Sequence, residues 1–568
     1  MGASEPEFVC DVLVAGSGAA GLAAAVALRH GGLDVIVAEK APCFGGTTAI
    51  SGGEIWIPGN DQARGGSFVD SADSAFRYLE AAPGGTLDPV RARAYVEEAA
   101  NALRFFEVNS HARFVLFPEA VDYYPDCPGA APGGRTLRSE PFDGRRLGAR
   151  FRALRHPLPV ATLLGGLSIA REDLPHLLNL GRSPRSMLYV ARLLGRYGLD
   201  RLSGLPRGSR TTMGNALAAR LALTLFEREV PLWLGAPVVA LEAEGGRVTG
   251  AVVKRGGARV VVRARKAVIL ACGGFPGSDT LKRRHYPHLA GECATTHVSI
   301  PPGENAGDGL ALAESLGAVL ERSVRHPAAW TPVSLAPVKG GGTTPFPHFG
   351  DRAKPGVIAV LRDGRRFTNE ASSYHDFVAA MIASAGTRPV EAFLITDARA
   401  IRAYGLGRAP SAPRSVEPHV RSGYLVRAGS LGELAGRIGI DGRALEATVA
   451  AYNGPARDGA DPAFGKGGNG FDRAAGDAAH RPNPCVAPLE TPPFYALRVL
   501  PGDIGTFLGL KVDATSRVLD SAGAPIPGLY AIGNDAASLM GGGYPGAGIT
   551  LGPALTFGYL AARAIAGT

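Results

Sequence analysis

A glycine-rich turn between an apolar strand and a helix is the feature that most constrains this chain. Residues 8–16, FVCDVLVAG, have the pattern of a buried strand, and residues 17–29 have the alanine and leucine content of a helix. The turn between them, Gly16 to Gly21, fits the pattern G-x-G-x-x-G. A second apolar strand follows at 33–38. This order predicts a strand–helix–strand unit that binds a dinucleotide.

Each glycine of the turn has its own physical reason. Gly16 permits the tight turn, Gly18 lets the backbone approach a pyrophosphate, and Gly21 allows close packing of helix against strand. The N-terminus of the helix favours the negative charge of the phosphates. Glu39 ends the second strand, where a carboxylate accepts hydrogen bonds from both ribose hydroxyls. A carboxylate in this place argues against a 2′-phosphate and therefore against NADP.

The residues after the second strand distinguish between cofactors. Residues 40–53 read KAPCFGGTTAISGG, a run of glycines and hydroxyl-bearing side chains. Such residues suit contacts along the pyrophosphate, ribityl chain and isoalloxazine edge of FAD, whereas an NAD site has no need of them. The sequence therefore predicts FAD.

The length of the chain and its strand pattern predict more than one domain. With 568 residues the chain exceeds what one hydrophobic core usually organises. Further segments with strand character, and one closing helix, lie at 230–234, 238–243, 248–254, 267–271, 528–533 and 552–565. We predict an α/β protein whose Rossmann-type FAD-binding domain comes from both chain ends, 1–295 and 495–568. An inserted α+β catalytic domain, 296–494, is expected to cap the flavin.

Charge and cysteine content argue against several other classes of protein. The net charge is +9, but the 60 basic residues are spread along the chain and accompanied by 51 acidic ones, so no nucleic-acid partner is expected. The six cysteines show no metal-ligand spacing, and we expect packed thiols and no metal site. The N-terminus is acidic where a signal peptide is basic, and no run of 18 residues lacks charges and helix breakers. We expect a cytoplasmic protein.

Residues 130–210 stand apart from the rest of the chain. Apolar blocks alternate there with arginines, and 185–199 have the pattern of a basic amphipathic helix. Its apolar residues are expected to share one face, with Arg185, Arg192 and Arg196 off it; they are Met187, Leu188, Val190, Ala191, Leu194 and Tyr197. Such a helix serves as a peripheral membrane contact, as a lid over an apolar substrate, or as ordinary packing on the body of the protein. Core packing is the commonest use of such a stripe.

Four further segments, beyond the dinucleotide-binding turn, indicate a particular protein family. They are AVILACGGF (267–275), ENAGDGLALAESLGA (304–318), GRRFTNE (364–370) and GLYAIGND (528–535). Together with the glycine turn they resemble the flavoprotein family of succinate dehydrogenase, soluble fumarate reductases and 3-ketosteroid dehydrogenases. The resemblance covers nearly the whole chain apart from 130–210. Because 45–53 lacks the histidine that carries flavin in membrane-bound succinate dehydrogenases, FAD is expected to bind non-covalently.

The resemblance implies a set of cofactor contacts. Gly533 and Asn534 would lie along the flavin. Thr550 and Leu551, at the start of the last helix, would place backbone N–H groups near flavin N1 and O2, where a helix N-terminus stabilises negative charge. The expected cofactor-binding residues are Gly16, Ser17, Gly18, Ala19, Ala20, Gly21, Glu39, Lys40, Gly46, Thr47, Thr48, Ser51, Gly52, Gly53, Val239, Gly273, Asp308, Gly533, Asn534, Thr550 and Leu551.

The segment near the C-terminus indicates which reaction the flavin supports. Fumarate-type members of the family place an arginine there, whereas this chain reads GGGYPGAG at 541–548. That segment resembles the tail of a 3-ketosteroid Δ1-dehydrogenase. The resemblance implies that the Tyr544 hydroxyl and the Gly548 N–H bind the C3 ketone. Tyr374 matches the family's catalytic base, which removes the C2 proton while the flavin accepts hydride from C1, and Tyr123 matches the supporting tyrosine.

Other functions stay open at this stage. A steroid Δ4-dehydrogenase, or a dehydrogenase of another cyclic ketone, would use similar residues. An ene-reductase would run in the saturating direction, and a flavin-bearing binding protein would not turn over at all. For a 3-ketosteroid Δ1-dehydrogenase the expected partners are an apolar 3-ketosteroid and a quinone or other electron acceptor. Membrane contact through 185–199 stays an open hypothesis.

Overall fold

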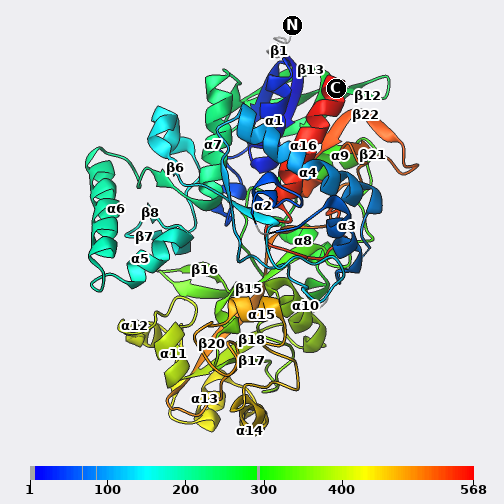
Figure 1. The fold of residues 1–568 in the computed structure, drawn as a ribbon. Helices are drawn as coiled ribbons and strands as arrows, with labels where there is room; N and C mark the ends of the chain where they lie inside the picture. The colour runs from blue at the N-terminus through cyan, green and yellow to red at the C-terminus, as the bar shows by residue number, and fades with distance from the viewer. Residues whose placement is uncertain (1–6, 67, 85, 291–294, 339, 568) are drawn as a thin grey trace.

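The computed structural model describes residues 7–66, 68–84, 86–290, 295–338 and 340–567. Figure 1 shows that the first and last segments of the chain, blue and red, lie in one body. The yellow segments, with α11 (Ala398–Tyr404) to α14 (Gly442–Ala456), form a second body below it. The mixture of helices and strands agrees with the expected α/β class and FAD-binding fold.

The first body is built on an eight-stranded sheet. Its main strand order is β10-β2-β1-β13-β12-β11, and β22 pairs with both β13 and β21. The strands β10, β2, β1, β13 and β22 pair in parallel, while β12 and β11 extend the sheet antiparallel. The bounds are β1 Glu7–Ala15, β2 Val35–Ala38, β10 Leu232–Trp233, β11 Val238–Glu244, β12 Arg247–Arg255, β13 Ala258–Leu270, β21 Arg517–Leu519 and β22 Pro525–Ala531.

The predicted strand–helix–strand unit is confirmed. Helix α1 (Ala19–His30) connects β1 to its parallel neighbour β2. The side chains of β1 alternate between two cores, as expected for a strand buried on both faces. Val12 and Val14 pack with the helices of the first body, whereas Leu13 and Ala15 pack in the core that reaches the second body.

The closing helix α16 (Leu551–Ala566) lies against α1, so the two ends of the chain complete one domain. Gly558 makes this contact close, because a Cβ there would lie 3.1 Å from both Ala20 O and Ala24 N. Helix α7 (Met213–Glu227) packs on the other side of α1 and shares its core. This three-helix layer fixes where α1 and α16 begin, and both N-termini point toward the cavity described below.

The second body contains a seven-stranded sheet of order β16-β15-β20-β18-β17, with β14 and β19 also paired to β20. Its bounds are β14 Val298–Ser299, β15 Ala328–Pro337, β16 Thr343–Pro347, β17 Val357–Val360, β18 Ala392–Asp397, β19 Val426–Ala428 and β20 Phe494–Thr506. Strand β20 pairs with four other strands of this sheet, β14, β15, β18 and β19, so the sheet continues to Thr506. The expected boundary at 494/495 thus falls at the start of a central strand. The domain division stays a prediction, with its last boundary placed after Thr506.

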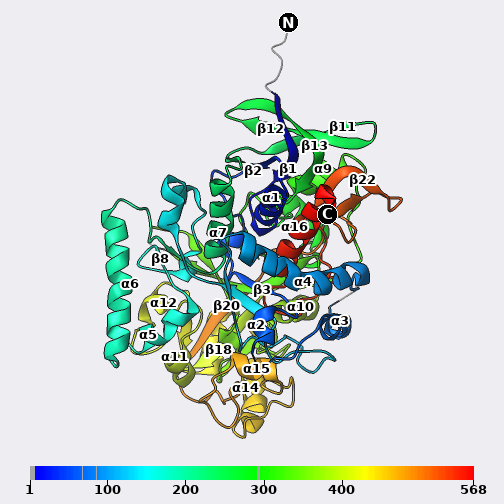
Figure 2. The same cartoon turned by 45° about the horizontal axis from the view of Figure 1, so that its top comes forward.

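The 130–210 segment begins within the first body, where Leu137 and Phe151 are part of the core, and its later part forms a projection. Helices α5 (Leu174–Leu178) and α6 (Pro184–Leu202) stand to the side of both bodies in Figures 1 and 2. The helix expected at 185–199 is present as α6, but its expected apolar face is divided. Val190 is buried, whereas Leu188, 53% exposed, and Leu194, 42% exposed, face solvent. The reason is that α6 contacts the protein along another stripe, which consists of Ser186, Val190, Leu193 and Asp200.

A buried network of four charges supports the start of helix α10 (Tyr374–Ala385). Arg366 donates two hydrogen bonds to Glu370 and two to Asp461, all at 2.8 Å. Lys466 Nζ lies 3.7 Å from Glu370 Oε2, and its side chain is fully buried. Burial alone raises the pKa of Glu370, but the charges of Arg366 and Lys466 lower it below its usual range. The two positive and two negative charges balance.

We expect Glu370→Gln to lower the free energy of unfolding by about 3–5 kcal/mol, because it leaves the buried charges of Arg366 and Lys466 uncompensated. Urea denaturation measures the loss. The matched control is Glu433→Gln, which breaks an exposed pair with Arg437 at 2.6 Å and should cost far less, because solvent screens that pair. Equal losses in the two variants contradict the role given to the network.

Candidate active site

The glycine turn after β1 forms the floor of the cofactor site. Gly16 has a φ of 110°, and a Cβ there would lie 2.2 Å from Ala271 O. A Cβ on Gly21 would lie 2.1 Å from Gly16 O, so both positions require glycine. Gly18 is different, since the nearest atom to its Cβ position is Thr48 Oγ1 at 3.8 Å. The turn therefore leaves an open approach at Gly18 in front of the α1 N-terminus, as a pyrophosphate requires.

Glu39 is held in a fixed position at the end of β2. Its Oε2 accepts hydrogen bonds from Ser17 N at 3.0 Å and Ser17 Oγ at 2.5 Å, and its Oε1 accepts from Ala41 N at 2.8 Å. The side chain nevertheless lines the cavity. A carboxylate fixed in this way fits the ribose-binding position of a dinucleotide site.

One cavity of about 730 Å³ runs from the glycine turn to the three tyrosines predicted from the sequence. Of the expected cofactor-binding residues, Gly21 and Val239 do not line it; the neighbour Val238 does. Those that line it are Gly16, Ser17, Gly18, Ala19, Ala20, Glu39, Lys40, Gly46, Thr47, Thr48, Ser51, Gly52, Gly53, Gly273, Asp308, Gly533, Asn534, Thr550 and Leu551. The length and lining of the cavity fit FAD, which would reach from Glu39 to the start of α16.

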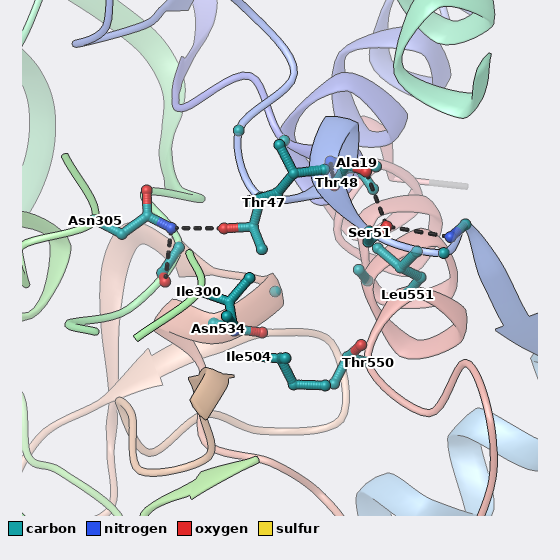
Figure 3. Close-up of a pocket in the computed structure, with 18 of the residues that line it drawn as sticks. Ala19, Thr47, Thr48, Ser51, Ile300, Asn305, Ile504, Asn534, Thr550 and Leu551 are labelled. Carbon is teal, nitrogen blue, oxygen red and sulfur yellow. Dashed lines mark hydrogen bonds between the residues drawn. The ribbon is translucent and has the colours of Figure 1, made fainter. Parts of the chain in front are cut away.

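Hydroxyl and amide groups line the middle of the cavity, as Figure 3 shows. Asn305 Nδ2 donates to Thr47 Oγ1 at 2.9 Å, and Thr48 Oγ1 accepts from Ala19 N at 2.9 Å. Ser51 Oγ donates to Thr48 O at 2.8 Å and accepts from Gly53 N at 3.2 Å. These bonds connect the wall after β2 to the N-terminus of α1. They keep small polar groups facing the space that a phosphate and a ribityl chain need.

Tyr123, Tyr374 and Tyr544 come together at the other end of the same cavity. The hydroxyl oxygens of Tyr123 and Tyr374 are 3.5 Å apart. The ring centroids of Tyr374 and Tyr544 are 5.0 Å apart, and those of Tyr123 and Tyr544 are 5.8 Å apart. Three phenols from segments more than 100 residues apart in sequence therefore face one space beside the cofactor site.

Local structure explains how each tyrosine is placed. Tyr374 is the first residue of α10, which Ser373 caps by accepting from Asp376 N. Tyr123 N donates to Pro545 O at 2.9 Å, which fixes it to the loop that carries Tyr544. Gly548, also in that loop, has a φ of 96°, and a Cβ there would lie 2.5–2.7 Å from Ile55 backbone atoms. The whole loop thus packs backbone to backbone on β3 (Glu54–Trp56).

The adjacent Tyr124 has a different role from Tyr123. Its hydroxyl donates to Asp376 Oδ1 at 3.0 Å, and it does not line the cavity. The sequence alone does not separate the two neighbours, whereas the structure places Tyr123 in the cavity.

Burial disfavours the charged form of each phenol. It raises the pKa of Tyr544 to about 12 and that of Tyr374 well above its usual range. Burial also raises the pKa of Tyr123, and the nearby charge of Arg352 opposes that shift. Tyr544 is therefore a neutral hydrogen-bond donor at ordinary pH. For Tyr374 to take a proton, its phenolate must be stabilised by its neighbours.

Arg352 is a buried cation that holds the backbone next to the three tyrosines. Its guanidinium donates to the carbonyl oxygens of Glu370 at 2.6 Å and Ser372 at 3.2 Å, in the turn that leads to Tyr374. It also donates to His348 O at 2.9 Å, beside the cavity wall at Phe349. One buried charge therefore holds both the proton-accepting tyrosine and the wall that faces it.

Several cavity residues could not be identified from the sequence. Leu158, Val160, Ala161 and Arg171 come from the 130–210 segment, which thereby forms one wall. Phe346, Phe349 and Asp351 line it from the second body, and Glu54 lines it from β3. Other lining residues had a signal, because they lie in segments that the sequence analysis singled out: Glu304 and Asn305 in ENAGDG, Ala271 and Cys272 in AVILACGGF, Ile50 in 40–53, and Ala547 in GGGYPGAG.

Within the described ranges, no cluster of metal-ligating side chains is present. The five cysteines in those ranges, Cys10, Cys43, Cys127, Cys272 and Cys485, form no disulfide bond, and Cys293 lies outside the described residues. No helix in the described part of the chain is long and apolar enough to cross a membrane.

Comparison with known proteins defines the class. The FAD binding domain family matches residues 11–551, so the protein is an FAD-binding flavoprotein. The chain is 39% identical to a 4-oxocyclohex-2-ene-1-carboxylate 5-dehydrogenase of Sinomonas cyclohexanicum, over 98% of this chain and 94% of the relative. It is 35% identical to a 3-oxosteroid 1-dehydrogenase of Mycobacterium tuberculosis, over 98% of both chains.

A solved structure agrees with these relatives. The 3-ketosteroid Δ1-dehydrogenase of Sterolibacterium denitrificans, in complex with 1,4-androstadiene-3,17-dione, has a TM-score of 0.89. It is 40% identical, over 98% of this chain and 99% of that chain. The chain belongs to the family of FAD-dependent 3-oxosteroid 1-dehydrogenases and is an oxidoreductase that acts on CH–CH bonds.

We expect Tyr374→Phe to lower the rate of anaerobic flavin reduction by ketone substrate by about 10²–10⁴-fold, with flavin content unchanged, because the ring stays and only the proton acceptor is lost. Stopped-flow absorbance of the flavin measures the rate. In the wild type the rate should rise toward alkaline pH, since the raised pKa keeps Tyr374 protonated near neutrality.

The matched control is Tyr124→Phe, whose hydroxyl is bonded to Asp376 outside the cavity. In this variant the ketone substrate should reduce the flavin at nearly the wild-type rate. A Tyr374→Phe enzyme as fast as this control removes Tyr374 as the base.

Proposed function

We propose that this protein is an FAD-dependent 3-ketosteroid Δ1-dehydrogenase, which introduces a double bond between C1 and C2 of ring A. The observation that carries the proposal is that three tyrosines face the same cavity as the cofactor-binding residues. The relatives that are 3-oxosteroid 1-dehydrogenases, and the solved steroid complex at 40% identity, support it.

The residues suit the three requirements of dehydrogenation beside a ketone. Bound FAD supplies the acceptor for the hydride from C1. The Tyr544 hydroxyl and the Gly548 N–H donate to the C3 ketone oxygen, which makes the C2 hydrogens acidic. Tyr374 first releases its hydroxyl proton to water, and as the phenolate it takes the C2 proton. Tyr123, whose hydroxyl is 3.5 Å away, donates a hydrogen bond to that phenolate. The positive charge of Arg352 lowers the pKa of Tyr123 and so makes its hydroxyl a better donor to that phenolate.

The cavity walls suit an apolar, flat substrate. Phe346, Pro347 and Phe349 lie on one side, and Leu158 and Val160 come from the 130–210 segment. These side chains exclude water from the tyrosines, which strengthens the hydrogen bonds to the ketone. Because the segment forms part of the wall, we assign it the role of a lid.

A smaller cyclic ketone is a second candidate substrate. The 39% identical Sinomonas relative is a 4-oxocyclohex-2-ene-1-carboxylate 5-dehydrogenase. Arg171 lines the cavity, and its guanidinium lies over the Phe117 ring at 4.5 Å, which leaves its N–H donors available to a carboxylate. The same tyrosines would serve this ketone in the same way.

We expect a 3-ketosteroid with a saturated C1–C2 bond to bleach the flavin anaerobically, and to do so faster than 4-oxocyclohexane-1-carboxylate at equal concentration, because its larger apolar surface fills the cavity. Flavin absorbance measures the reduction, and NMR of the ring A alkene separates a Δ1 from a Δ4 product. The reverse order of rates makes the smaller ketone the substrate. No reduction by either ketone, with fumarate quickly oxidising a pre-reduced enzyme, would instead identify an ene-reductase.

The outer side of the lid presents an apolar surface to solvent. On α6, Met187, Leu188, Leu194, Leu199 and Leu202 are 42–87% exposed. Leu163, Leu164, Leu174 and Leu180 extend this surface beyond the helix. Arg185 and Arg192, on the same helix, are also exposed.

We propose that this apolar surface contacts anionic membranes. Exposed leucines insert among lipid chains while arginines pair with anionic head groups. The inner side of the same segment lines the cavity, so an apolar substrate would pass from the bilayer to the tyrosines. A membrane quinone is then the proposed acceptor of electrons from reduced FAD.

We expect the protein to co-float with vesicles that contain phosphatidylglycerol, and Leu188→Glu with Leu194→Glu to abolish co-flotation, because both charges fall on the exposed stripe. Flotation in a density gradient measures it. The control is Val108→Glu, at a valine 74% exposed on α4 (Pro89–Asn109), which should not change binding. Flotation that survives the double substitution excludes this surface.

A further inference from the structure

Glu54 is a carboxyl group inside the cavity that the reaction described above does not use. It is the first residue of β3, and it lines the cavity with Tyr123, Tyr544 and Gly548. Its side chain turns back over Gly52, where a Cβ would lie 2.1 Å from Glu54 Oε2. The side chain is only partly buried, so its carboxyl faces the cavity rather than the core.

The position of Glu54 is fixed relative to the ketone-binding loop. Ile55, its neighbour on β3, lies against the backbone of Gly548. Trp56 N donates to Gly548 O at 3.2 Å, which holds strand and loop together. Glu54 therefore enters the cavity directly beside the two groups proposed to bind the ketone.

The surroundings leave this carboxyl without a matched partner. Arg138, opposite Glu54 in the register of β5 (Thr136–Ser139), and Arg171 on η4 (Arg171–Asp173) are the cations that act on it. Both guanidinium groups lie over the Phe117 ring, at 4.1 and 4.5 Å. Among the described side chains, none forms an ion pair with Glu54 within 4 Å. The negative charge of Glu54 raises the pKa of both Tyr123 and Tyr544.

We propose that Glu54, in its neutral form, is a third hydrogen-bond donor to the ketone oxygen and that its ionised form switches the site off. This inference rests on the proposed function and adds a catalytic residue to it. In the step itself the C2 proton passes to Tyr374, the C1 hydride to the flavin, and the C3 oxygen carries the developing negative charge. That oxygen receives hydrogen bonds from Tyr544, Gly548 and Glu54.

Physical chemistry supports the neutral form. Burial raises the pKa of Glu54, and the hydrogen bond from its own backbone N–H together with the charges of Arg138 and Arg171 offsets the shift only in part. An apolar ligand in the cavity removes more water and favours the neutral acid further. A neutral carboxylic acid beside a tyrosine stabilises an enolate in other apolar sites. A carboxylate in the same place repels the enolate and also raises the pKa of Tyr544.

The test compares Glu54→Gln and Glu54→Ala with the wild type by anaerobic flavin reduction across pH. Glutamine keeps a donor but does not ionise, so the ratio of the Glu54→Gln rate to the wild-type rate should be near one at low pH. Above the pKa of Glu54 it should rise by up to about tenfold per pH unit. Because Tyr374 gives both enzymes the same pH dependence, this dependence cancels in the ratio of their rates. Glu54→Ala loses the donor, and its rate should fall by about 100-fold at low pH.

Flavin content of each variant, read from its absorbance, shows that the site is intact. Glu119→Gln is the matched control, because Glu119 is exposed and also acts on Arg171. It should keep the wild-type profile. A pH-independent Glu54→Gln ratio, or a Glu54→Ala enzyme as fast as the wild type, overturns this inference. If no ketone reduces the wild-type flavin at any pH, the proposed function fails instead.

Discussion

Backbone contact between the C-terminal loop and β3 is the constraint on which the site depends. Gly548 lies against Ile55, and Gly552, at the start of α16, lies against Trp56. A side chain at either glycine would separate the two segments, since a Cβ would approach backbone atoms to 2.7 Å or less. Through this contact the last fifty residues bring Tyr544 and the α16 N-terminus to the cavity that the first fifty residues begin.

The second body completes the site through electrostatics as well as through the packing of α10 in its core. The network of Arg366, Glu370, Asp461 and Lys466 anchors the chain just before Tyr374, and Arg352 holds the turn between them. Buried charges tolerate few alternative arrangements, because each needs its partner. This explains how a tyrosine on one body keeps its place against two tyrosines carried by the other.

Much of the fold and the cofactor site could be predicted from sequence, because both depend on local signals. The glycine turn, Glu39 and the strands around them have spacing set by one strand–helix–strand unit. Glu54 and Leu158 carry no such signal, since they reach the cavity only through long-range packing. The exposed face of α6 was also not predictable, because periodicity gives an apolar stripe without saying which residues the protein covers.

The later part of the 130–210 segment, residues 158–202, has one side in the cavity and the other in solvent. It contributes none of the three tyrosines and none of the expected cofactor contacts. Its sequence is therefore free to diverge among relatives without disturbing the redox centre. An exchange of this segment between two such enzymes would transfer the preferred substrate size and the membrane contact together. The residues that carry out hydride transfer would remain those of the recipient enzyme.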